Sequence, residues 1–243
     1  CKPEKYSDDC VFVNIHLKDE NDPVHEKRVK ELMDYGFPLI NIYMNDTLEI
    51  AAEFYRWEMA TATAGAILGI NPFDQPNVQE NKTVTEGLIK ELQVSGTLPL
   101  QEPLIKEEGL KYHTNLYSMK GYLLLEDFFS RAHQGDYITI QAYLPEDEKI
   151  NKLLNEIKSL LQEWLCVATT IGYGPRFLHS TGQYHKGGPN NGLFLQITAP
   201  VSNDVSLPGR GYSFGQLISA QAQGDYETLV KHNRKVLKIE LTE

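Results

Sequence analysis

Apolar, β-branched stretches alternate with amphipathic helical stretches along most of this sequence, and that order restricts the fold more than any other feature. The predicted strands are 10–17, 37–44, 137–143, 165–171, 193–199 and 235–241. Helices are predicted over 23–35, 47–69, 76–92, 122–132, 145–164, 214–223 and 225–233. Strands that are separated by helices indicate parallel or mostly parallel sheets covered by helices on both faces. The expected fold class is therefore α/β.

Turn and capping residues set the expected boundaries of these elements. Asp22-Pro23 is typical of an N-cap followed by proline in the first turn, and Gly36 is typical of the residue after a helix end. Gly224 is expected to divide the last helical stretch into two short helices. Residues 97–111 contain turn residues and little periodicity, so we expect them to link two domains.

The bulk composition restricts the possible partners and location. The chain has 243 residues, a formal net charge of −10 and a pI near 5.2. Because an acidic chain is a poor electrostatic partner for nucleic acid or for an anionic membrane surface, we expect neither as a partner. No apolar run is long enough to cross a bilayer, and no secretory signal is visible, so we expect a cytoplasmic location.

The cysteines agree with that location. Cys1, Cys10 and Cys166 have no metal-ligand spacing, and such a sparse, odd set indicates reduced thiols. Cys166 lies in an apolar run, so we expect a buried, inert thiol. The opening Cys1-Lys2-Pro3 lacks a methionine and is interpreted as the start of a fragment of a longer protein. The histidines expected at the surface, without a function, are His25, His113, His133 and His232.

The first candidate site is Asn71-Pro-Phe-Asp-Gln-Pro-Asn-Val-Gln-Glu-Asn-Lys82. Gln75 falls at the start of a predicted helix, and Lys82 lies two turns inside it. The N-terminus of a helix presents unpaired N–H groups and a positive dipole end, which suit an anion or a sugar oxygen. The alternative is a capped helix with a solvated lysine, and spacing alone favours this alternative.

The second candidate site is the glycine-rich segment 172–192, which is expected to be a long loop between two strands. No Asp or Glu occurs from Trp164 through Asn203, so the loop is expected to be electropositive. Loops at strand carboxyl ends are where α/β sheets bind ligands, and glycines let backbone N–H groups approach phosphate. The candidate ligand-binding residues are Arg176, His179, Ser180, Thr181, Gln183, His185 and Lys186. The alternative is an ordered surface loop with ordinary turn glycines.

A thiol–imidazole pair of Cys166 and His179 is a weaker candidate for nucleophilic catalysis. The sequence offers no third group that would orient such a pair. We therefore give it little weight.

The first candidate segment is similar to the closing motif of glucose-6-phosphate isomerases, in which Phe-Asp-Gln is followed by a valine and then a lysine. The residues that fit this motif are Phe73, Asp74, Gln75, Val78 and Lys82. Residues 176–198 and 214–226 resemble the extra C-terminal region of bifunctional transaldolase/glucose-6-phosphate isomerase chains. The resemblance covers most of residues 10–241.

This resemblance implies a domain order and an activity. Residues 1–96 would be the C-terminal portion of a SIS (sugar isomerase) domain, 97–111 a linker and 112–243 an additional α/β domain. The reaction would interconvert glucose 6-phosphate and fructose 6-phosphate through a cis-enediol, with no metal and no cofactor. Lys82 matches the lysine beside the sugar ring that aids ring opening, and Gln75 matches the glutamine near the substrate.

The partners implied by the resemblance are a sugar phosphate and the upstream SIS and transaldolase domains of the same chain, and a homo-oligomer is left open. The family's glutamate base, its ring-opening histidine and most of its phosphate-binding hydroxyls lie upstream of the Phe-Asp-Gln motif. No matching motif occurs in the residues that precede it here. Thr181-Gly-Gln-Tyr-His185 is reminiscent of the histidine's context but lies downstream, so that role is not transferred.

We therefore expect this chain to carry part of an isomerase active site and to be inactive alone. The alternative function is a non-catalytic domain that binds a sugar phosphate or docks the transaldolase.

Overall fold

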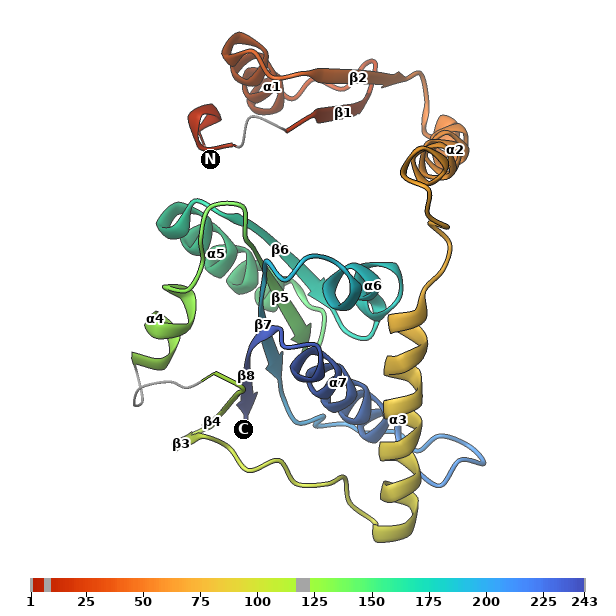
Figure 1. Cartoon of the computed structure of the whole chain (residues 1–243), viewed down its shortest axis with the longest axis vertical. Coiled ribbons are helices and arrows are strands. Elements are labelled where there is room, and N and C mark those ends of the chain that lie inside the picture. Colours follow the sequence, from red (N-terminus) through yellow and green to blue (C-terminus); the bar gives the residue numbers. More distant parts are fainter. Residues whose placement is uncertain (1, 7–9, 117–122, 243) are drawn as a thin grey trace. The chain divides into compact units, whose positions relative to one another are not determined.

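The computed structural model describes residues 2–6, 10–116 and 123–242, and the chain forms two compact units, Cys1–Asp74 and Gln75–Glu243 (Figure 1). The boundary between the units therefore lies before α3 (Pro76–Ser95) and not in the expected linker 97–111. α3 belongs to the second unit because it packs along α7 (Phe214–Lys231). None of the described helices combines the length and the apolar composition needed to cross a bilayer.

The first unit contains a parallel pair of strands, β1 (Phe12–Leu17) and β2 (Leu39–Met44), connected by α1 (Pro23–Tyr35). The predicted ends of α1 are confirmed. The Asp22 carboxylate accepts the backbone N–H groups of Val24 and His25, and Gly36 ends the helix with φ +100°. Two short 3₁₀ turns, Pro3–Lys5 and Thr47–Glu49, and the long helix α2 (Ile50–Leu68) complete the unit.

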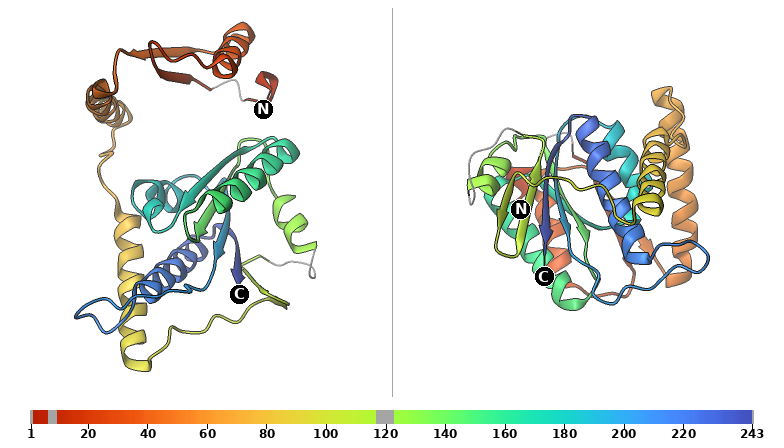
Figure 2. Two further views of the ribbon diagram at one scale, coloured as in Figure 1. Left: turned by 180° about the vertical axis from the view of Figure 1, so that it is seen from behind. Right: turned by 90° about the horizontal axis from the view of Figure 1, so that it is seen from below.

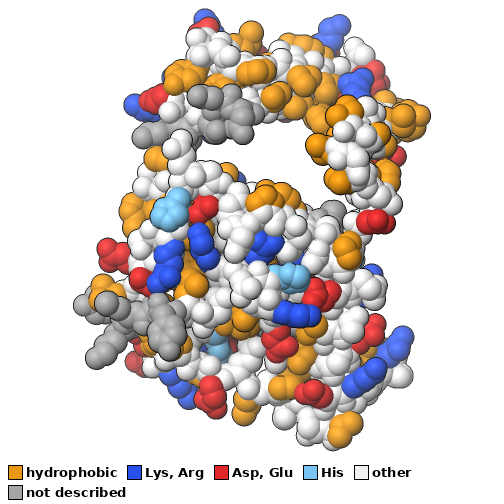
Figure 3. All heavy atoms as spheres, in the orientation of Figure 1, with side chains coloured by type: hydrophobic (Ala, Val, Ile, Leu, Met, Phe, Trp, Pro, Cys, Tyr) orange, Lys and Arg blue, Asp and Glu red, His pale blue; other side chains and the backbone are white. Residues whose placement is uncertain are grey.

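Few side chains of the first unit are buried. Leu32, Phe37 and Ile42 are at most 9% exposed, whereas many apolar side chains of this unit are exposed, including Phe54, Tyr55 and Ile67 of α2 (Figure 3). The helical spacing of apolar residues in α2 correctly predicted a helix, but most of those apolar side chains are not buried.

The second unit contains a six-stranded mixed sheet with the order β3-β4-β8-β7-β5-β6. Its strands are β3 (Ile105–Glu107), β4 (Leu110–Thr114), β5 (Tyr137–Tyr143), β6 (Ala168–Tyr173), β7 (Gly192–Thr198) and β8 (Lys235–Leu241). The last four are parallel to one another, and β3 and β4 are antiparallel additions. The α/β class is confirmed, but β3 and β4 were not predicted. They are short, and their lysines and glutamates interrupt the apolar pattern that marks a strand.

The remaining helices of this unit are α4 (Leu123–Phe129), α5 (Glu148–Leu165) and α6 (Ser180–Gly187). α5 ends at Cys166, which has φ +54° and is exposed, so the prediction of a buried thiol is wrong. The apolar run that suggested burial belongs half to the end of a helix and half to β6, and Cys166 lies in the turn between them.

Gly224 does not divide the last helix, which runs unbroken as α7. A Cβ atom at position 224 would lie 2.8 Å from Oγ1 of Thr85 on α3. The glycine therefore permits close contact between two helices instead of ending one.

Residues 172–192 do not form the long loop that was predicted. β6 continues to Tyr173, a 3₁₀ turn covers Arg176–Leu178, and α6 follows directly. α6 has eight residues and contains two glycines, so it shows no apolar repeat from which a helix would be predicted.

The two faces of the sheet bury different side chains. Under α4 and α5, β5 and β7 contribute Ile138, Ile140, Leu193 and Leu195. The alternate positions face α6 and α7 and include Gln141, which like Gln196 is fully buried. Figure 2 (right) shows the two groups of helices on opposite sides of the strands, with α3 on the side of α7.

Candidate functional site

A groove of about 210 Å³ lies between α3 and the connection from β6 to α6. Its walls come from three parts of the second unit that are far apart in the sequence. They are Val78, Asn81, Lys82, Thr85 and Glu86 from α3, Pro175, Leu178 and His179 from the connection, and Gln221 from α7. The two candidate segments singled out in the sequence therefore meet in one groove.

Helical periodicity explains the contribution of α3. Val78, Asn81 and Thr85 are spaced by three and four residues, so they share one face, and all three are buried. Lys82 and Glu86 lie one position further around the helix and are exposed at the edge of the groove. The groove thus has a buried floor of apolar and polar side chains and a charged rim.

Lys82 and His179 are the two predicted site residues that the groove brings together. Both side chains are exposed, and among the described residues neither forms an ion pair. An ammonium group and an imidazole are therefore free to bind an oxygen-rich or anionic ligand at this position.

Gln183 holds α6 against the first turn of α3. Its side-chain oxygen accepts the backbone N–H of Asn77 at 2.9 Å, and its amide nitrogen donates to the Asn77 side chain at 2.8 Å. The first of these bonds satisfies one of the N–H groups that a helix N-terminus leaves unpaired. Gln183 therefore fixes the position of the groove wall instead of facing a ligand.

Lys186 forms a buried ion pair with Asp225 of α7. Its ammonium lies 2.5 Å from the carboxylate, and both side chains have no exposed surface. Asn81 also donates to this carboxylate, at 3.3 Å, and Thr85 donates to Asn81 at 3.4 Å. The pair is connected to the groove through Asn81, but Lys186 itself does not reach solvent. An ammonium in this position neutralises a buried carboxylate and is not available to a phosphate.

The side chain of His185, on α6, is buried among aromatic rings. Its ring is 5.1 Å from that of Phe194 and 6.1 Å from that of Tyr137, and the residue is 3% exposed. Burial, and then the charges of Lys186 and Arg234, lowers the pKa of His185 to about 4. The imidazole is therefore neutral near pH 7 and forms part of the core.

The structure places the other predicted residues outside the groove lining. Arg176 is exposed, pairs with Glu146 and lies over the ring of Tyr173 with its guanidinium carbon 5.8 Å from the ring centre. Thr181 is exposed on α6, and Ser180 begins that helix, although its side chain lies outside the described part. Gln75 is the exposed N-cap of α3, and its carbonyl oxygen accepts the N–H groups of residues 78 and 79.

The expected positive charge of segment 172–192 is largely neutralised. Glu146 and Asp225 come from outside the stretch that lacks acidic residues, and they pair with Arg176 and Lys186. A count of charges along the sequence did not reveal this compensation, because the partners are brought close only by the fold. At the groove itself, Lys82 remains the cation and Glu86 the carboxylate.

Sequence reasoning also missed residues that shape this region. Asp225 was assigned only to a short helix, and Asn81 and Gln221 were not considered. Local sequence gave no signal for them, because Asp225 is one of two acidic residues in a helical stretch that also contains three glutamines. His113, predicted at the surface, is 4% exposed, so that prediction is wrong. β4 is covered on this side by α7, as the contact with Tyr226 shows.

No protein-family model matches the chain. A stretch of 71 residues is 37% identical to the glucose-6-phosphate isomerase of Lactobacillus helveticus (strain DPC 4571), which corresponds to 28% of this chain. A structural comparison aligns 94% of the chain with 51% of a hypothetical protein from Thermus thermophilus, with a TM-score of 0.42 and 14% identity. Part of this chain is thus similar to a glucose-6-phosphate isomerase, and the chain spans 16% of the length of that curated relative.

Proposed function

We propose that the groove at Lys82 forms part of the phosphosugar site of an aldose–ketose isomerase that interconverts glucose 6-phosphate and fructose 6-phosphate. The observation that supports this most is that Lys82 and His179, from two separate candidate segments, line the same groove. The partial similarity to a glucose-6-phosphate isomerase agrees with it. Upstream SIS and transaldolase domains of the same chain would complete the protein, and the SIS domain would supply the general base.

The isomerisation requires a group that stabilises negative charge on the sugar oxygens, and the Lys82 ammonium can do this. A base removes the proton from C2 of the open-chain aldose while the C1 carbonyl oxygen gains a proton, which gives the cis-enediol. The enediol then gains a proton at C1 and loses one from the C2 hydroxyl, which gives the ketose. Negative charge develops on the oxygens in both steps, and a nearby ammonium group stabilises it. In our proposal Lys82 also assists the opening of the sugar ring.

The floor of the groove is held in a fixed arrangement. The Asn81 side chain is bound to Asp225, and Asp225 is bound in turn to Lys186. Positioned polar groups of this kind support a binding site, because the ligand does not have to order them. We propose that His179, which lines the groove, adds a contact to the substrate hydroxyls. Gln75 lies outside the lining, so its match to the family's glutamine gives it no contact in this groove.

We also propose that the first unit is the C-terminal end of a SIS domain and that most of the second unit is an additional domain. The first unit has a parallel strand pair and a helix, α2, whose apolar side chains are exposed. A further layer of the same domain would cover them.

The test of this proposal uses the full-length protein and two lysines of the same helix. Lys82→Ala should lower kcat/KM for fructose 6-phosphate isomerisation about 100-fold. Lys90→Ala is the matched control, since Lys90 is exposed on α3 outside the groove, and it should leave the rate unchanged. His179→Ala should raise KM about tenfold with a smaller change in kcat. Unchanged turnover in Lys82→Ala would remove the assigned role.

The alternative of binding without catalysis gives a different result in the same experiment. One observation favours this alternative. The charges of Lys82 and Glu86 at the groove cancel, and such a pair suits the binding of a sugar but does not by itself provide a proton transfer. If the full-length protein binds fructose 6-phosphate in calorimetry, loses binding in Lys82→Ala and shows no isomerisation, the groove belongs to a binding domain.

A further inference from the structure

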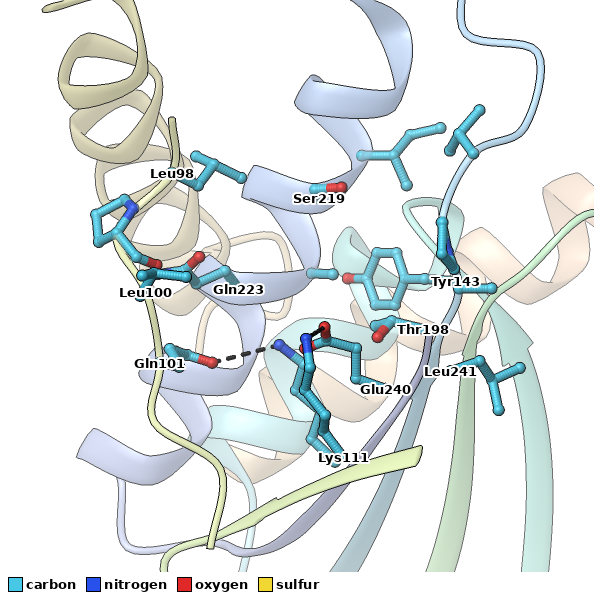
Figure 4. A pocket seen from close by; sticks show the side chains of 17 residues that line it. Leu98, Leu100, Gln101, Lys111, Tyr143, Thr198, Ser219, Gln223, Glu240 and Leu241 are labelled. Carbon is cyan, nitrogen blue, oxygen red and sulfur yellow. Dashed lines mark hydrogen bonds and ion pairs between the residues drawn. The ribbon is translucent and has the colours of Figure 1, made fainter. Parts of the chain in front are cut away.

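A second cavity, of about 310 Å³, opens at the carboxyl end of the parallel strands in the second unit (Figure 4). Tyr143 and Thr198 are the last residues of β5 and β7, and Glu240 is near the end of β8. Residues 98–101 and α7 close the other sides. This edge of an open α/β sheet is where ligands are bound most often. None of the residues predicted from the sequence as site residues lines this cavity.

Tyr143 lines this cavity, and its hydroxyl oxygen is buried without a partner among the described residues. Tyr143 is 5% exposed, and Figure 4 shows its ring extending inward with the oxygen at the tip. No described residue forms a hydrogen bond with that oxygen. A buried hydroxyl that lacks a partner is destabilising, so it commonly marks a place where a ligand or another polar group binds.

Lys238 supplies a buried positive charge that is not paired. The residue is 7% exposed, and its ammonium contacts the neutral side-chain oxygen of Gln101 at 3.3 Å (dashed line in Figure 4) and lies 5.8 Å from the centre of the Tyr226 ring. In the described part of the chain it forms no ion pair. Burial lowers the pKa of Lys238, although Glu240 and Glu227 act in the opposite direction.

The nearest carboxylate of the cavity is already engaged. Glu240 pairs with Lys111 at 2.6 Å and also approaches the buried His113 at 3.5 Å. Burial would raise the pKa of Glu240, but the hydrogen bond and charge of Lys111 lower it overall. Burial, and then the charge of Lys238, lowers the pKa of His113, so this imidazole is neutral near pH 7. Among the charged residues that line the cavity, Lys111, Lys238 and Glu240 together leave one positive charge, while Glu227 acts on Lys238 from outside the lining.

Apolar side chains line much of the rest of the cavity. They are Leu98, Leu100, Val201, Ile218 and Leu241. A ligand that fills the cavity therefore needs an anionic end that carries one charge and a body without charge. A phosphate dianion fits less well, because its second charge would lie near Glu240.

We propose that this cavity binds a small organic monocarboxylate. Its carboxylate lies between the Lys238 ammonium and the Tyr143 hydroxyl, and its apolar body contacts Leu98, Leu100 and Ile218. The Lys111–Glu240 pair remains intact and fixes the direction of the carboxylate. This site does not depend on the function proposed for the Lys82 groove.

The test is a titration of the whole chain with hexanoate, followed by calorimetry and by NMR chemical shifts. Hexan-1-ol matches the apolar body without the charge, and inorganic phosphate supplies charge without the body. We expect saturable hexanoate binding, with hexan-1-ol and phosphate each at least about tenfold weaker. Lys238→Met and Tyr143→Phe should each weaken hexanoate binding about tenfold. Lys149→Met, at an exposed lysine in the first turn of α5, should have no effect.

Circular dichroism of each variant separates lost binding from lost folding. Ile218→Trp offers an independent test, because the larger side chain fills the cavity without removing a polar group. The proposal is overturned if hexanoate does not bind at concentrations on the order of 10 mM, or if folded Lys238→Met and Tyr143→Phe bind it as the parent does. Equal affinity for hexan-1-ol would indicate an apolar cavity only. Equal affinity for phosphate would indicate a general anion site, and both results contradict the proposed ligand class.

Discussion

The sheet of the second unit has one face under α4 and α5 and one under α6 and α7, and the two faces bury different chemistry. The first is built from side chains such as Ile138, Ile140 and Phe128, all at most 1% exposed. The second, the polar face, buries the Lys186–Asp225 pair and two glutamines beside apolar side chains such as Phe194 and Val236. Apolar burial contributes stability in proportion to area, whereas buried polar groups depend on each other for position.

Both cavities lie on the polar face, and residues of α7 line each of them. Asn81 lines the Lys82 groove and binds Asp225, while Tyr143 lines the second cavity. Burial, and then the negative charge of Asp225, raises the pKa of the Tyr143 phenol. The Lys186–Asp225 pair therefore interacts with one residue of each candidate site, namely Asn81 in the Lys82 groove and Tyr143 in the second cavity. Both faces therefore contribute to the stability of the fold, and the face under α6 and α7 also carries the polar groups beside the two cavities.

The largest expected effect is on the apolar face. Phe128→Ala removes a ring that is 1% exposed and packs edge-on against Phe129 at 5.2 Å. The lost burial and the resulting cavity should lower the free energy of unfolding by about 4 kcal/mol. Urea denaturation measures the change. Hexanoate binding by the folded fraction should stay the same, and a loss of binding would mean that the faces are not separable.

The polar face should respond almost as strongly when one charge is removed. Asp225→Ala leaves the Lys186 ammonium buried without a partner and should cost about 3 to 4 kcal/mol in unfolding free energy. The double variant Lys186→Met/Asp225→Leu replaces both charges by apolar groups and should recover at least half of that loss. If the double variant is no more stable than the single one, the two residues are not coupled in the way that the short contact indicates.

The pH dependence of stability tests the same face through His185. The unfolded chain takes up a proton near pH 6.5, but the folded chain does so only near pH 4, so between these values the unfolded state binds more protons. Stability due to this residue is therefore present above pH 6.5 and is lost as the pH falls towards 4, by about 3 kcal/mol in total.

Urea denaturation of the parent and of His185→Phe between pH 4 and pH 7 isolates this contribution. The stability of the parent relative to the variant should rise with pH across that window. Phe177→Leu changes a neighbouring ring without a titrating group, so its difference from the parent should not vary with pH. A flat difference for His185→Phe would show that the imidazole is not buried as described.

The sequence predicted those parts of the fold that depend on local pattern. β5 and β8 have the predicted bounds because each is a short apolar run flanked by turn residues. α1 was placed correctly by Asp22 and Gly36, which act within one turn of the helix. These features need no knowledge of distant residues.

The features that could not be predicted depend on distant contacts. Asn77 and Gln183 are 106 positions apart, and Lys186 meets a carboxylate 39 positions later. Four positively charged or titratable residues were therefore assigned to one ligand-binding loop, whereas only His179 lines the groove. The alternation of residues in β5 shows that a strand has two faces, but not that Gln141 faces the interior.

Gly224 offers the smallest effect and the most direct test of how α3 and α7 shape the groove. Alanine favours a helix by about 1 kcal/mol over glycine, but its Cβ would lie 2.8 Å from Oγ1 of Thr85, and such overpacking costs about 1 to 3 kcal/mol. Gly224→Ala should thus lower the unfolding free energy by about 1 kcal/mol. Thr85→Ala removes the clashing oxygen, so the double variant should be more stable than the sum of the single changes. Additive changes would mean that the helices move apart without strain, and the groove floor at Asn81 would then not depend on this contact.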